Sequence, residues 1–244
     1  MKKRDNTYIG ISFIILVFGI IFIPRIVDRL SAGDVLSNDG RSQNINYNTK
    51  DLLYWEVDGE RKKVPNFSFT NQNGELISNK DYEGKVYIVE FFFTTCPTIC
   101  PVMNYNLVEI QNSFDDFKDL GFASFTINPA YDTVEVLKDY ADEYGVTNKN
   151  WNFMTGDKDA IYDLAKTGFY LHSEENLNAP GGFEHSGNFA LIDKEGYIRS
   201  RSDDFGNPIF YYKGYVDYKK EYEIEGENQE ISILKEDILQ LLKD

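Results

Sequence analysis

The chain of 244 residues is 42% hydrophobic and 15% aromatic, which allows the core of one domain of ordinary size plus appendages. Its 25 Lys and Arg residues stand against 40 Asp and Glu residues, so the formal net charge is −15. This excess of acid argues against nucleic-acid binding, which needs a basic surface.

An apolar run from Tyr8 to Pro24 follows three basic residues and is the first predicted element. Its 17 residues span about 25 Å as a helix at ~1.5 Å per residue, and apolar neighbours extend it toward a ~30 Å hydrocarbon core. We expect an uncleaved transmembrane anchor over residues 1–30, with the N-terminus in the cytoplasm and the rest on the periplasmic side. A cleaved signal peptide is the alternative, with a weak cleavage site at 31–33. No cysteine directly follows the run, so a lipoprotein anchor is not expected.

Residues 31–63 are predicted to form a polar tether with a short N-terminal extension, and residues 64–244 one domain. The strands are expected at 52–55, 64–69, 86–93, 121–127, 151–154, 169–171, 188–193 and 197–200. The helices are expected after the two cysteines and at 133–145, 157–167 and 231–243. Residues 203–229 are polar and tyrosine-rich, and we interpret them as an insert of uncertain structure. Alternating strands and helices predict a three-layer α/β domain with a mixed sheet.

The stretch from Val86 to Gln111 joins a buried strand to a helix, and the two cysteines of the chain stand at the junction. The strand is a nearly continuous β-branched and aromatic run, typical of a strand covered on both faces. Pro97 suits the first helical position, which predicts Cys96 at the N-cap and Cys100 about one turn later on nearly the same face. Because a helix N-terminus favours the thiolate, the pair could close a disulfide or bind a soft metal ion.

A purely structural disulfide, or two buried thiols, is the alternative interpretation of this pair. A bridge across three intervening residues removes little entropy from the unfolded chain and stabilises little. A redox or metal-binding role is therefore the better explanation of the pair. A cysteine pair at the carboxyl end of a central strand, opening a helix, is the thioredoxin arrangement, here with one extra residue between the cysteines.

The chain has two histidines, and they receive different interpretations. His185 stands in a glycine-rich loop just before the predicted strand at 188–193, a loop that lies beside the cysteine turn in a thioredoxin-like sheet. An imidazole beside two thiolates makes a three-coordinate site soft enough for Cu(I), and a fourth ligand would suit Cu(II). Zinc usually has four ligands and fits less well. His172 is interpreted as an exposed loop residue next to acidic neighbours.

Three motifs resemble the Sco/SenC family of copper-binding, membrane-anchored proteins. They are the stretch from Phe92 to Pro101 with both cysteines, the stretch from Thr126 to Thr133, and Glu184-His185-Ser186 shortly before Ala190-Leu191-Ile192-Asp193. The resemblance covers roughly residues 64–199, and the combination of motifs is more specific than the cysteine spacing alone.

This resemblance implies a thioredoxin-like fold in which Cys96, Cys100 and His185 bind copper as Cu(I) or Cu(II). It also implies a role in copper insertion into cytochrome c oxidase, with the copper-centre subunit of a terminal oxidase as partner and other copper chaperones or thiol reductases as further partners. Two residues depart from the family pattern. Asn128 precedes Pro129 where Asp is common, and Glu184 stands where Asp is common.

Two functions from different classes follow. The first is a copper metallochaperone that holds one copper at Cys96, Cys100 and His185. The second is a thiol–disulfide oxidoreductase in which Cys96 attacks and Cys100 resolves, which gives His185 no essential role. A peroxide reductase ranks third, because the cysteine turn offers no Arg beside the nucleophile.

Overall fold

The computed structural model describes residues 16, 18, 52–202, 208–219 and 228–244. The described residues from 52 onward all belong to one compact unit of the chain. Except for residues 16 and 18, the predicted anchor lies outside the described residues, as does most of the predicted tether. Within the described ranges, no helix has the length and apolar character that crossing a membrane requires. The transmembrane anchor stays a prediction.

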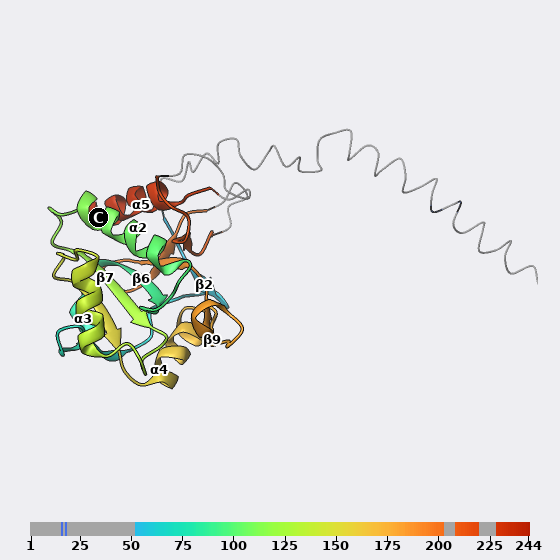
Figure 1. Cartoon of the computed structure of the whole chain (residues 1–244). Helices are drawn as coiled ribbons and strands as arrows, with labels where there is room; N and C mark the ends of the chain where they lie inside the picture. The colour runs from blue at the N-terminus through green and yellow to red at the C-terminus, as the bar shows by residue number, and fades with distance from the viewer. Residues whose placement is uncertain (1–15, 17, 19–51, 203–207, 220–227) are drawn as a thin grey trace, which may run out of the picture. The chain divides into compact units, whose positions relative to one another are not determined.

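From β5 to β10 the described elements alternate between strands and helical segments, whereas strands alone precede and follow this part before the last helix (Figure 1). The strands are β1 (Leu53–Tyr54), β2 (Glu56–Val57), β3 (Glu60–Arg61), β4 (Ser68–Asn71), β5 (Leu76–Ser78), β6 (Val86–Phe92), β7 (Leu120–Thr126), β8 (Trp151–Thr155), β9 (Ser173–Glu175), β10 (Phe183–His185), β11 (Asn188–Ile192), β12 (Ile198–Ser200) and β13 (Tyr212–Lys213). The helical segments are η2 (Asn79–Tyr82), α2 (Cys100–Ser113), α3 (Val134–Glu143), α4 (Lys158–Asp163), η3 (Leu164–Gly168), η4 (Pro180–Gly182) and α5 (Ile231–Lys243).

The main sheet has the strand order β1-β12-β11-β6-β7-β8-β4-β5, and β13 pairs with β11 beside this path. Strands β6, β7 and β8 are parallel, whereas β11 pairs antiparallel with β6, and β4 with β8. The sheet is therefore mixed, as predicted. Every residue of β6 and β7 is buried, which agrees with their nearly continuous apolar sequences.

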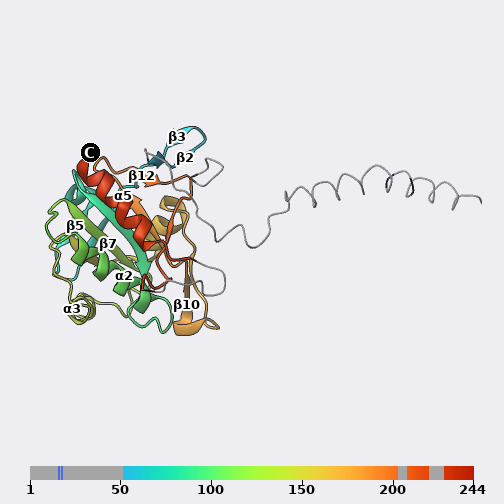
Figure 2. The ribbon, with the colours of Figure 1, turned by 90° about the horizontal axis from the view of Figure 1, so that it is seen from above.

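Neighbouring phenylalanines of β6 show that both faces of the sheet are covered, because successive side chains of a strand point to opposite faces. Phe92 stacks on Tyr140 of α3, with ring centroids 5.5 Å apart. Phe91 instead packs against Phe169, which follows α4 and η3, at 5.8 Å. Helices α2 and α5 contact each other, and α5 contacts β6 (Figures 1 and 2). The domain thus has the predicted three layers.

Most predicted elements are confirmed within a few residues. The helix expected at 133–145 is α3 with Thr133 as its N-cap, and the helix expected at 157–167 begins as α4 after its N-cap Asp157. The strand predicted at 169–171 is wrong, because these residues follow the π-helical segment η3 and form no strand. The chain between His172 and Gly187, where both histidines were expected in a loop, contains the two-stranded ribbon of β9 and β10.

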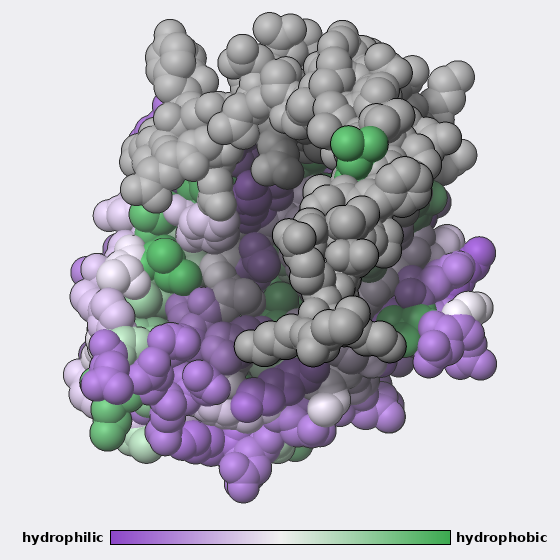
Figure 3. Space-filling view, turned by 90° about the vertical axis from the view of Figure 1, so that its right-hand side faces the viewer, coloured by the Kyte–Doolittle hydropathy of each residue, from purple (hydrophilic) through white to green (hydrophobic). Residues whose placement is uncertain are grey.

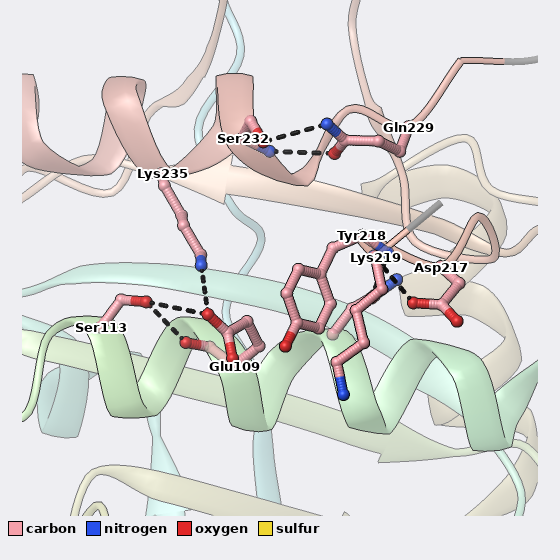
Figure 4. Close-up of polar contacts among 9 residues, drawn as sticks. Glu109, Ser113, Asp217, Tyr218, Lys219, Gln229, Ser232 and Lys235 are labelled. Atoms are coloured by element: carbon pink, nitrogen blue, oxygen red, sulfur yellow. Dashed lines mark hydrogen bonds and ion pairs between the residues drawn. The ribbon is translucent and has the colours of Figure 1, made fainter. Parts of the chain in front are cut away.

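The segment interpreted as an insert, 203–229, contributes to the core where it is described. Tyr212 of β13 is buried and donates a hydrogen bond to Asp237 of α5 at 2.6 Å. Figure 4 shows Tyr218 beside the contact in which Lys235 of α5 donates to Glu109 of α2 at 2.8 Å. Residues 203–207 and 220–227 lie outside the described residues.

The face of the molecule in Figure 3 carries mainly hydrophilic described side chains, with isolated hydrophobic residues among them. This surface fits the acidic composition of the chain. The residues that matter for chemistry lie instead where β6 ends and α2 begins.

Candidate metal centre

The turn that carries the cysteines is fixed at the carboxyl end of β6. The backbone N–H of Thr94 donates to the carboxylate of Asp132 at 3.2 Å. The hydroxyl groups of Thr94 and Thr126 donate to the same carboxylate, and Asp132 is fully buried. Burial raises the pKa of Asp132, while these three donors oppose the rise. One carboxylate therefore ties the end of β6 to the loop after β7.

Helix α2 begins at Cys100 with Ile99 as its N-cap, so the prediction that Cys96 is the N-cap is wrong. The reason lies in Pro101. In a helix that began at Pro97, Pro101 would stand in the interior, where it cannot donate to residue 97 and its ring clashes with that carbonyl. With the helix beginning at Cys100, Pro101 occupies the first turn, where the missing N–H costs nothing.

His185 reaches the cysteines from the ribbon of β9 and β10. This ribbon packs on the cysteine turn, because a Cβ atom placed on Gly181 would lie 2.7 Å from the Phe93 ring and 3.1 Å from Pro97. The rings of Phe93 and His185 meet edge to face at 5.8 Å. Figure 2 shows β10 next to the start of α2.

The structure brings Cys96, Cys100 and His185 together, with their donor atoms all within 4.8 Å of one another. Both cysteines are reduced and buried, and His185 is partly exposed. The Cys100 Sγ atom lies 3.2 Å from His185 Nε2, whereas His185 Nδ1 faces the Ser186 carbonyl at 3.3 Å. A contact of Nδ1 with a carbonyl fixes the tautomer that leaves Nε2 available as a ligand.

The two thiols have opposite protonation preferences. The Cys100 thiol donates to the sulfur of Cys96 and lowers the pKa of Cys96 well below its usual range, with smaller contributions from His185 and from backbone N–H groups. Burial raises the pKa of Cys100, and the negative charge of Cys96 raises it further. The pair therefore shares one proton, with the thiolate on Cys96.

Glu90 of β6 is a residue that the sequence analysis passed over. It is fully buried, its Oε1 atom accepts from Ser124 at 2.7 Å, and its Oε2 atom has no hydrogen-bond partner. Burial raises the pKa of Glu90 to about 7. The signal in the sequence was one acidic residue inside an otherwise apolar strand.

His172 is more than half exposed, as predicted, but it is not isolated. Its Nε2 atom lies 3.8 Å from a carboxylate oxygen of Glu174 and 3.7 Å from one of Glu184. An open pocket of about 520 Å³ is lined by His172 and Glu184 as well as by Cys96 and His185.

The chain combines this fold with two cysteines and a histidine at the end of the central parallel strand. These features define the class of thioredoxin-like proteins with a soft-metal or redox site. The model of one family, SCO1/SenC, matches residues 56–217. The SCO1 protein homolog of Bacillus subtilis is 30% identical over 154 residues, which cover 61% of this chain and 74% of the relative. The chain belongs to the SCO1/SenC family.

Solved structures of the family have the same fold. A SCO1/SenC family lipoprotein from Bacillus anthracis is 28% identical with a TM-score of 0.62, over 79% of this chain and 98% of that one. BsSco, described as a Sco-family cytochrome c oxidase assembly protein with a disulfide switch, is 24% identical with a TM-score of 0.59, over 79% and 96%. ScoI of Bradyrhizobium japonicum, solved with copper bound, is 22% identical with a TM-score of 0.51, over 57% and 88%.

Proposed function

We propose that this chain is a copper metallochaperone that binds one copper ion through Cys96, Cys100 and His185 and delivers it to the copper centre of a cytochrome c oxidase. The observation that carries the proposal is the convergence of two sulfur donors and one imidazole nitrogen within 4.8 Å. Membership in a family with a copper-bound structure and a cytochrome c oxidase assembly protein supports the choice of cargo and partner.

The chemistry of the donor set fits copper. Thiolates are soft ligands that select Cu(I), and an imidazole nitrogen completes a three-coordinate site. The thiolate on Cys96 is ready to bind, whereas Cys100 must release its proton, so copper binding releases a proton. Oxidation to a disulfide removes both thiolates and blocks loading.

Delivery requires that the partner replaces these ligands one after another. Cys96 lines the open pocket, whereas Cys100 is completely buried. We propose that the copper-centre thiolates of the oxidase subunit approach from the pocket side and displace Cys96 first. We further propose that residues 64–244 are the copper-binding domain, held on the periplasmic side of the membrane by residues 1–30.

The test is copper stoichiometry on the full-length chain, kept in mild detergent because of its apolar N-terminal run. The reduced protein is loaded with Cu(I) without oxygen, and weakly held metal is removed by a competing chelator. We expect about one copper per chain, and a loss of affinity of at least tenfold in His185→Ala.

The matched control is the second histidine of the chain. His172→Ala removes an imidazole from the same ribbon but not from the sulfur site, so Cu(I) retention should be unchanged. An unaltered chain that retains no Cu(I) under these conditions contradicts the proposal.

A second function, thiol–disulfide exchange, is favoured by the thiolate on Cys96. This thiolate attacks a disulfide of an exported partner and forms a mixed disulfide. Cys100 then loses its proton and attacks Cys96, which releases the partner as a dithiol and leaves the Cys96–Cys100 disulfide. Two electrons pass to the partner in this exchange.

A single variant, His185→Ala, distinguishes the two functions. His185→Ala should abolish copper retention and leave the rate of exchange with a disulfide peptide within about twofold, whereas Cys96→Ser should abolish both. If His185→Ala retains copper, the redox function becomes the better explanation of the dithiol.

A further inference from the structure

The ribbon of β9 and β10 carries potential ligands on both of its faces. In the antiparallel register, Glu174 stands opposite Glu184, and Ser173 stands opposite His185. Because successive side chains alternate, the two glutamates share one face of the ribbon while Ser173 and His185 share the other. His172, two residues before Glu174, lies on the face of the glutamates, so these three side chains form a group separate from the sulfur site.

The donor atoms of this group lie close enough together to bind one ion. The donor atoms of His172, Glu174 and Glu184 all lie within 4.8 Å of one another, and the imidazole Nε2 is 3.7 and 3.8 Å from the two carboxylates. Ligands about 2.0–2.2 Å from a tetrahedral ion are separated by roughly 3.4 Å. The two nitrogen–oxygen distances exceed this separation by a few tenths of an ångström, and the exposed side chains can rotate to bring all three donors to one ion.

The charges point to a cation at the same place. Like charges directly opposite each other destabilise an antiparallel pair. Within the described part of the chain, His172 is the basic side chain that lies within 4 Å of Glu174 and Glu184. Its imidazole is positively charged only when protonated. Lys158 pairs instead with the neighbouring Glu175 at 2.6 Å. A bound cation relieves the repulsion between the two carboxylates.

One carboxylate is already oriented for binding. Asn176 donates to Oε1 of Glu184 at 2.6 Å, which leaves Oε2 directed at His172. Hydrogen bonds of this kind hold ligating carboxylates in position and raise metal affinity. Glu184 and His172 also line the pocket of about 520 Å³ that reaches Cys96, so an ion can enter from solvent.

We propose that His172, Glu174 and Glu184 form a second metal site, which takes a divalent first-row transition ion such as Zn(II) or Cu(II). One nitrogen and two oxygen donors are a harder set than two thiolates, so this site selects divalent ions rather than Cu(I). The three protein ligands leave a position for water or another ligand from the pocket. This second site uses none of the residues of the sulfur site, so its test is independent of the proposed function.

Zinc binding to the full-length chain tests this site in a Cys96→Ser/Cys100→Ser background, where thiolates cannot compete. Zn(II) is titrated against a fluorescent chelator at pH 7.5. We expect one zinc per chain, with affinity reduced at least tenfold by His172→Ala and by Glu184→Gln.

Two control variants should leave zinc affinity unchanged. Glu175→Gln removes a carboxylate from the other face of the ribbon, and His185→Ala removes the other imidazole. Absence of zinc binding, or binding that persists in His172→Ala, overturns the site. If the double serine variant does not fold, the wild-type background replaces it, and His172→Ala should then lower the zinc stoichiometry by one.

Discussion

At the scale of single residues, Cys96 is a thiolate and Cys100 a neutral thiol, although only three residues lie between them in the sequence. The largest cause of the low pKa of Cys96 is the hydrogen bond that the Cys100 thiol donates to it. Cys100 itself is buried and protonated. The reactivity of one cysteine is thus set by the other.

Replacing the donor should raise the pKa of Cys96. We expect Cys100→Ala to react more slowly with iodoacetamide at pH 5–6 than the wild-type chain, because less of Cys96 is then the thiolate. Near pH 9, where both proteins are largely ionised, the rates should converge. Cys100→Ser, whose hydroxyl can still donate, should resemble wild type more closely. Identical pH profiles for wild type and Cys100→Ala would mean that Cys100 does not control Cys96.

Glu90 provides a test at another buried residue. Its folded-state pKa of about 7 lies above the ordinary glutamate value of 4.5, so the folded chain binds more protons between these pH values than the unfolded chain. Stability therefore falls as pH rises from about 4.5 to 7. Glu90→Gln keeps an oxygen that accepts from Ser124 and has no such dependence.

We expect Glu90→Gln to gain stability over wild type as pH rises, by on the order of 3 kcal/mol between pH 5 and 8. Urea unfolding at the two pH values measures the gain. Asp132 and Asp237 also have raised pKa values but are present in both proteins, so their contributions cancel. A constant difference between the two proteins would show that Glu90 titrates normally.

At the scale of elements, a buried ion pair attaches α5 to the sheet. Asp237 of α5 accepts from Arg201 Nε at 2.5 Å and from the Tyr212 hydroxyl at 2.6 Å, and its side chain is 1% exposed. Arg201 also pairs with Glu236 at 2.6 Å, but the Glu236 side chain is 69% exposed. The two neighbouring acids thus touch the same guanidinium in very different surroundings.

We expect Asp237→Ala to cost about 3–5 kcal/mol of stability, because it removes two buried hydrogen bonds and the negative charge nearest the Arg201 Nε. Glu236→Ala, the control on the same helix, should cost about 0–1 kcal/mol. Denaturant midpoints with unchanged slopes measure both losses. Equal losses for the two variants would mean that burial does not set the strength of this contact.

Adjacent glycines of the ribbon allow a similar comparison beside the metal centre. Gly181 and Gly182 both have positive φ, +78° and +85°, so alanine is strained at either position. Only at Gly181 would the added Cβ meet the Phe93 ring, at 2.7 Å.

Gly181→Ala should therefore move the ribbon away from the cysteine turn and weaken Cu(I) binding at least tenfold more than Gly182→Ala. Competition with a Cu(I) chelator gives both affinities, and circular dichroism confirms folding. Similar Cu(I) affinities in the two variants would show that this close approach does not position His185.

At the scale of the whole molecule, the sequence predicts the parts of the fold that local patterns determine. The buried strand β6, the cap at Thr133 and the amphipathic α5 follow from apolar runs, a capping residue and helical spacing. The ribbon of β9 and β10 could not be predicted in this way, because it has no alternating apolar pattern and depends on pairing between distant residues. Tyr212 was missed for the same reason, since its burial depends on β11 and α5.

The candidate site shows the same division. The approach of His185 to the cysteines could be predicted, because a loop before a late strand lies beside the cysteine turn in this type of sheet. The start of α2 was misplaced because two prolines compete for the first turn, and packing decides between them. The group around His172 arises from the register of two short strands, which no local pattern fixes.

Net charge gives a prediction for the molecule as a whole. With a formal charge of −15, repulsion among acidic groups opposes the compact state, and added salt screens it. We expect the Tm at pH 7.5 to rise by about 2–4 °C when NaCl increases from about 10 to about 300 mM, which corresponds to ~1 kcal/mol for a chain of this size. The control is the same series near the sequence pI of about 4.6, where the repulsion and the salt effect should disappear. A Tm that falls with salt at pH 7.5 would show that attractive contacts such as Lys235–Glu109 outweigh the repulsion.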